Sequence, residues 1–88
     1  MNLKAKLSLV TRSSKDYQAK ICELISQMTL KEKIGQMSQF ASYDDRLSEE
    51  LQTALREGKV GSVLNEVNLK LVNEIQRIAV EESRLGIP

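Results

Sequence analysis

The sequence of 88 residues contains no histidine and a single cysteine. The lack of histidine excludes the commonest general base, the histidine-dependent serine and cysteine triads, and most zinc sites. A lone cysteine, Cys22, cannot form a disulfide within the chain, so the sequence is not a small disulfide-stapled secreted protein. Because Cys22 lies among Ile21, Leu24 and Ile25, we expect it to be a small core residue rather than a reactive thiol.

Long apolar runs, aromatic residues and an excess of one charge are also missing. No run approaches the roughly 20 apolar residues that a membrane-spanning helix needs. Tyr17, Phe40 and Tyr43 are the only aromatic residues, so we expect an aliphatic core. Thirteen basic and twelve acidic side chains are interspersed and give a net charge of +1. We therefore predict neither a nucleic-acid nor a membrane partner.

The start of the chain is locally basic, because Lys4, Lys6, Arg12 and Lys15 precede the first acid, Asp16. We predict a solvated, flexible tail over residues 1–13, with an organelle-type presequence as the alternative. The early lysines interrupt the apolar residues before an export signal can form. Together with the lone cysteine, this predicts a cytoplasmic protein.

Apolar residues at three- and four-residue steps predict two helices over the first 40 residues. The first begins near Ser14 and runs to Met28. The second follows Thr29, which with Glu32 forms the Thr-x-x-Glu pattern of a capping box. Gly35 inside the second helix predicts a close approach by another backbone, with a bend or an end of the helix as the alternative.

A loop over residues 41–45 leads to a third predicted helix, which Asp45 or Ser48 can cap and which Gly58 ends. Its apolar side consists of Leu47, Leu51, Ala54 and Leu55. Residues 60–64 then predict a short buried strand, because Val60 and Val63 are β-branched and turn signals lie on both sides. Gly61 within this strand predicts tight packing.

A fourth helix is predicted from about Asn68 to Gly86, with Ile87 and Pro88 leading into extended chain. Its inward residues are Leu71, Val72, Ile75, Ile78 and Ala79, and Arg77 and Glu81 pair on the outside. The order is three helices, a strand, a helix and the start of a strand, which is a βαβ unit without its second strand. An unpaired strand edge predicts an unstable or self-associating product.

Residues that could carry chemistry are few. The carboxylates come as sequence neighbours, at residues 44–45, 49–50 and 81–82, and neighbours on a helix do not face a shared substrate. Gly58 and Gly61 precede the predicted strand, whereas the glycines of a phosphate loop follow one, so no phosphate loop is predicted. The balanced charge of residues 31–33 argues against a DNA-binding helix-turn-helix over residues 24–37. Asn65 is the residue best placed for chemistry, at the end of the predicted strand, although turn formation or helix capping explains it more simply.

Three blocks between about Ile25 and Pro88 carry the most specific sequence pattern, and they cover residues 28–37, 55–65 and 73–88. In this order and spacing they resemble the N-terminal end of a glycoside hydrolase family 3 enzyme, the family of many β-glucosidases and β-xylosidases. The resemblance implies that residues 14–88 are an incomplete part of an α/β domain of the TIM type, a (β/α)8 barrel, with lead-in helices, the first strand, the first barrel helix and the start of the second strand.

The resemblance also implies retaining hydrolysis of terminal β-D-glucosyl or xylosyl residues by a pair of carboxyl groups. The family's sugar-binding and catalytic positions have no counterpart in this chain, so the resemblance assigns no catalytic, substrate-binding, cofactor or metal residue here. We expect the chain by itself to be inactive. The alternative is a non-catalytic helical interaction module that binds a partner through the strand edge or through the face formed by Leu51 and Leu55.

Overall fold

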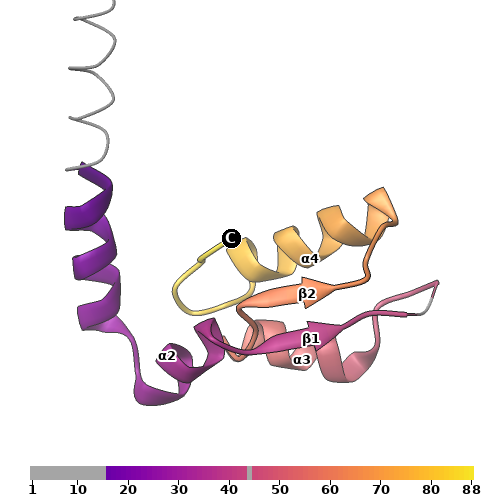
Figure 1. Ribbon diagram of the computed structural model, residues 1–88, viewed down its shortest axis with the longest axis horizontal. Coiled ribbons are helices and arrows are strands. Elements are labelled where there is room, and N and C mark those ends of the chain that lie inside the picture. Colours follow the sequence, from indigo (N-terminus) through magenta and orange to yellow (C-terminus); the bar gives the residue numbers. More distant parts are fainter. Residues whose placement is uncertain (1–15, 44) are drawn as a thin grey trace, which may run out of the picture.

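The computed structural model describes residues 16–43 and 45–88. A helical segment over residues 16–27 comes first, followed by five elements. These are α2 (Leu30–Gln36), β1 (Gln39–Ala41), α3 (Glu49–Arg56), β2 (Ser62–Leu64) and α4 (Leu69–Glu81). In Figure 1 the two strands lie side by side near α3 and α4, while segment 16–27 stands away from them. The tail predicted over residues 1–13 lies outside the described residues.

The strands form a two-stranded parallel sheet in which Phe40 lies opposite Val63. α3 connects them, so β1, α3 and β2 make a complete βαβ unit. The predicted single unpaired strand is therefore wrong, because β1 was missed and was expected to be a helix end and a loop. The strand expected over residues 60–64 is confirmed only as the shorter β2. Val60 and Gly61 precede this strand, and the Gly61 N–H donates to the Ser38 carbonyl at 2.8 Å.

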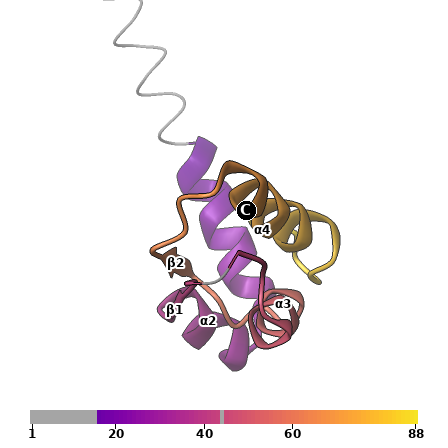
Figure 2. The ribbon, with the colours of Figure 1, turned by 90° about the vertical axis from the view of Figure 1, so that its right-hand side faces the viewer.

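The sheet has one covered face and one uncovered face. α3 and α4 lie on the same side of the strands, as Figure 2 shows. Phe40 and Val63, at the middle of each strand, pack against the core on that side. The alternating positions Gln39, Ala41, Ser62 and Leu64 are exposed, and no described residue buries them. This period-two alternation is that of a sheet packed on one face only.

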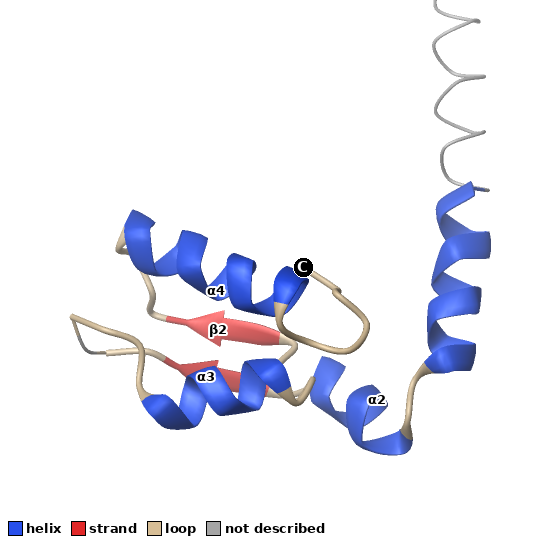
Figure 3. Ribbon diagram, turned by 180° about the vertical axis from the view of Figure 1, so that it is seen from behind, coloured by secondary structure: helices blue, strands red, loops and turns tan. Residues whose placement is uncertain are grey.

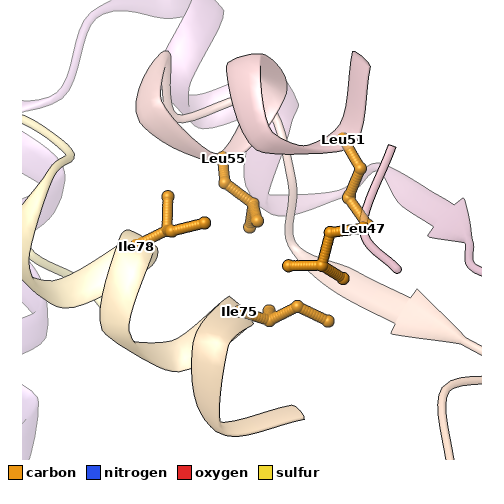
Figure 4. Packing of buried hydrophobic residues seen from close by; sticks show 5 residues of the cluster. All are labelled: Leu47, Leu51, Leu55, Ile75 and Ile78. Atoms are coloured by element: carbon orange, nitrogen blue, oxygen red, sulfur yellow. The ribbon is translucent and has the colours of Figure 1, made fainter. Parts of the chain in front are cut away.

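The core lies between α3 and α4, where Leu47, Leu51, Leu55, Ile75 and Ile78 point toward one another (Figure 4). Ile78 is completely buried. The inward faces predicted for both helices are thus confirmed, except that Val72 is 37% exposed. The alternative docking face of Leu51 and Leu55 is wrong, because the structure buries both side chains against α4.

The helix starts follow the predicted caps. Thr29 and Glu32 form a complete capping box at α2, in which each side chain accepts a backbone N–H of the other residue. Ser48, rather than Asp45, caps α3 by accepting the Leu51 N–H at 3.2 Å. Asn68 caps α4 by accepting the N–H groups of Lys70 and Leu71.

The helix ends follow the predictions less closely. α3 ends as expected, because Gly58 takes a φ of 72° and Lys59 N–H donates to the Ala54 carbonyl, the pattern of a Schellman motif. α4, however, ends at Glu81 rather than at Gly86. Gly86, with a φ of 63°, makes a later turn in which its N–H donates to the Ser83 hydroxyl. The chain therefore leaves the helix about a turn earlier than the glycine indicated.

Two glycines allow backbone segments to touch. A Cβ at Gly35 would collide with the Gly58 carbonyl oxygen and would lie 2.7 Å from Lys59 Cα. A Cβ at Gly61 would collide with the Gln36 carbonyl. The close approach predicted at Gly35 and the tight packing predicted at Gly61 are both confirmed. Because neither residue has a Cβ, α2 packs directly against the segment that leads into β2.

Segment 16–27 carries apolar side chains that the rest of the chain leaves largely uncovered. The view from behind shows this helix standing away from the strands and from α3 and α4 (Figure 3). Tyr17, Ile21 and Ile25 are 62%, 54% and 47% exposed. The expectation that Cys22 is a core residue is wrong, because its helix stands off the body and the thiol is exposed. Within the described ranges, no helix has the length and apolar content to span a bilayer.

Candidate functional site

The C-terminal edge of the parallel sheet is the candidate site, because loops that leave this edge carry the chemistry in α/β enzymes. Ser42 and Tyr43 follow β1, and Asn65 and Glu66 follow β2. Asn65 lies where the sequence placed it, and its φ of 68° makes it the turn residue by which the chain leaves β2. The simpler interpretation of Asn65, turn formation, is confirmed.

Ser42 and Glu66 join the two loops at this edge. The Ser42 hydroxyl donates to Glu66 Oε2 at 2.5 Å, and the Ser42 N–H donates to the Leu64 carbonyl at 3.0 Å. The second carboxylate oxygen, Oε1, accepts the Asn68 N–H at 3.0 Å. Ser42 is buried, with 7% of its surface exposed. We call this pair the rim clip.

The rim clip keeps Glu66 ionised. The hydroxyl of Ser42 first, and then the backbone N–H of Asn68, lower the pKa of Glu66 below its ordinary value, because both donors stabilise the charged form. A carboxylate whose two oxygens already accept hydrogen bonds from its own chain is poorly placed to act as a nucleophile or a general acid. Its chemistry here is to hold Ser42 and the start of α4 in place.

A second side-chain contact, an ion pair between Glu32 and Arg84, lies at the opposite end of the sheet, near the N-terminal ends of the strands. Glu32, 8% exposed, accepts Arg84 Nη2 at 2.5 Å, and the same nitrogen donates to the Gln27 carbonyl at 2.8 Å. The Arg84 guanidinium first, and the Thr29 N–H second, lower the pKa of Glu32 to about 2. We call this pair the base clip; it ties α2 and the end of segment 16–27 to the chain that follows α4.

The acidic residues of α3 and α4 lie on the solvated surfaces of these helices. Arg77 contacts Glu74 at 2.7 Å and Glu81 at 3.4 Å, which confirms the predicted pairing of Arg77 with Glu81. Glu82 bridges α3 and α4 by contacting both Arg56 and Arg77. Across residues 16–43 and 45–88, no group of three or more His, Cys, Asp or Glu side chains could hold a metal ion.

Sequence reasoning missed the rim clip, because Ser42 and Glu66 are 24 positions apart and the strand that brings them together was not predicted. A weak signal did exist. Each of the two residues lies within two positions of a strand's C-terminal end, and polar residues there meet whenever parallel strands pair.

A comparison with known proteins finds a similarity to the periplasmic beta-glucosidase of Salmonella typhimurium, with 31% identity over 68 residues. The matched part is 77% of this chain and 9% of that enzyme, so the chain spans less than a tenth of its relative's length. No family model matches the chain.

This comparison contradicts the cytoplasmic location expected from the sequence, because the similar protein is periplasmic. The expectation rested on the first residues of a chain that corresponds to only a small part of that enzyme. The finding that stands is a similarity, short and distant, to part of a glycosidase.

Proposed function

We propose that the chain is a structural part of a family 3 glycoside hydrolase and belongs to a (β/α)8 catalytic barrel. The observation that carries this proposal is the 68-residue similarity to a beta-glucosidase. The three ordered sequence blocks over residues 28–37, 55–65 and 73–88 support it. In this proposal, β1 and β2 are neighbouring strands of the barrel, and α3 and α4 belong to the outer ring of helices.

The fold is consistent with such a role in three respects. The strands are parallel and follow a βαβα order. Helices cover one sheet face only, which leaves the other face free to become a barrel interior. Ile87 and Pro88 line a pocket together with Val60 and Ser62, beside the N-terminal end of β2, where a third parallel strand would start.

The proposed activity of the whole enzyme is retaining hydrolysis of β-glucosides or β-xylosides. One carboxylate attacks the anomeric carbon while a second carboxyl group, about 5 Å away, protonates the departing oxygen. We propose that both groups come from outside these 88 residues. The contribution of this chain is then to build part of the active face and to hold its loops, and the chain alone is inactive.

A chimera tests the proposal. Residues 25–88 replace the corresponding segment of the Salmonella typhimurium periplasmic beta-glucosidase, and hydrolysis of an aryl β-glucoside is measured. We expect the chimera to retain activity, because the two segments build the same part of the barrel. A chimera that is inactive, whether folded or misfolded, contradicts the proposal. Turnover by the purified 88-residue chain above a heat-denatured control contradicts its inactivity.

A further inference from the structure

The two clips occupy opposite ends of the same sheet and differ in what they connect. The rim clip joins Ser42, directly after β1, to Glu66, two residues after β2. It therefore acts between the two loops at the C-terminal edge. The base clip joins Glu32 in α2 to Arg84 after α4, at the edge where barrels place residues that serve stability rather than chemistry.

The rim clip fixes these loops more firmly than their backbone alone would. β1 and β2 are three residues long, so few ladder hydrogen bonds define how their ends are spaced. Beyond the last pair, Ala41 with Leu64, the Ser42 N–H still bonds the Leu64 carbonyl, and the side-chain bond to Glu66 extends this pairing. The bond from Asn68 N–H to the same carboxylate couples it to the N-cap of α4.

We propose that Ser42 and Glu66 are positioning residues of the sugar-binding face, which set the spacing of the two loops that contact the substrate. This inference rests on the proposed function. Tyr43, 79% exposed and adjacent to buried Ser42, is the first side chain that this spacing places at the rim. The clip does not touch the reacting atoms; it acts through the loops that it joins.

The test uses the chimera with Ser42→Ala, with Glu66→Ala and with both changes together. Each single change is expected to lower kcat/KM roughly tenfold, the equivalent of about one hydrogen bond lost in the ordering of the loops. The double variant is expected to lose no more than Glu66→Ala alone, because Ser42 acts only through its bond to this carboxylate. Melting temperatures are recorded for every variant.

The matched control is Glu32→Gln in the same chimera, which removes the negative charge of the base clip at the other end of the sheet. It is expected to lower the melting temperature while leaving kcat/KM within twofold of the unsubstituted chimera. A merely structural role for the rim clip would make Ser42→Ala behave like Glu32→Gln, and that result overturns the inference. Inactivity of the unsubstituted chimera is a different result, which overturns the proposed function and this inference together.

Discussion

At the scale of single residues, the chain is held by helix caps between near neighbours and by contacts between distant segments. Thr29 and Glu32 are three positions apart and need only each other's backbone, so their capping box could be predicted from spacing. Gly35 was recognised because glycine is costly inside a helix unless something needs the space. Ser42 gave no such signal, because its partner Glu66 reaches it only through strand pairing.

The base clip makes the free energy of unfolding depend on pH. Folding lowers the pKa of Glu32 to about 2, so the folded state binds its proton less readily than the unfolded chain, whose carboxyl titrates near 4.5. The contribution of Glu32 to the free energy of unfolding is therefore present above pH 4.5 and is lost as the pH falls toward 2. Glu57, Glu66, Glu74 and Glu82 also have lowered pKa values and add to the trend.

Glu32→Gln isolates the contribution of this one carboxyl group. Melting temperatures followed by circular dichroism between pH 7 and pH 2 are expected to fall less steeply for the variant than for the unchanged chain. The two curves should approach each other toward pH 2, where Glu32 is protonated in the unfolded chain and begins to be protonated in the folded state. Parallel curves over the whole range would show that the pair with Arg84 does not form in solution.

Gly35→Ala should destabilise the chain although alanine is the better helix former. In an open helix, alanine would gain about 1 kcal/mol over glycine. Here the added Cβ meets the backbone of Gly58 and Lys59, which cannot swing away as a side chain could. Urea denaturation is expected to show that the free energy of unfolding falls by about 1–3 kcal/mol. Gln36→Ala, at the exposed neighbouring position, is the control and should change stability by less than about 0.5 kcal/mol.

At the scale of elements, α3 and α4 could be predicted because their apolar residues repeat with the helical period over two or more turns. β1 could not. It has three residues, of which only Phe40 is large and apolar, and it directly follows a strong helix pattern. Its strand conformation comes from pairing with β2, which is a tertiary contact that no local pattern records.

The packing of α4 against α3 can be tested with two alanine substitutions on one helix. Ile78 is fully buried among leucines of α3, whereas Val80, two residues on, is 48% exposed. Ile78→Ala is expected to lower the free energy of unfolding by about 2–5 kcal/mol, because it leaves a cavity in the core. Val80→Ala should cost less than about 1 kcal/mol. Equal losses in urea denaturation would contradict the orientation of α4.

At the scale of the whole molecule, the described residues leave much apolar surface in water. Leu30, Ile34 and Met37 of the α2 region are 73%, 51% and 81% exposed, and segment 16–27 adds its own apolar face. An apolar groove of about 460 Å³ lies between that face, Met37 and Ile87. Surfaces of this kind promote association. We propose them as a second cause of the self-association that the sequence predicts from a strand edge.

Sedimentation velocity at several concentrations tests this cause. The chain is expected to associate as its concentration rises, and the double variant Ile21→Glu with Ile25→Glu should associate less, because it charges the exposed face of segment 16–27. Ser26→Glu, on the polar side of the same helix, is the control and should behave like the unchanged chain. If the double variant associates as strongly, the strand edge is the better explanation.

The parallel pairing of β1 with β2 has a consequence for synthesis of the chain. β1 is made early, but its partner strand comes only after α3, and the core closes only when Ile78 of α4 has been added. At ordinary translation rates, roughly 2–7 s pass between the synthesis of β1 and the addition of Ile78. During that time the backbone N–H and C=O groups of β1 are open to other extended chains, so the newborn protein passes through a period in which chaperone capture and misassembly compete with folding.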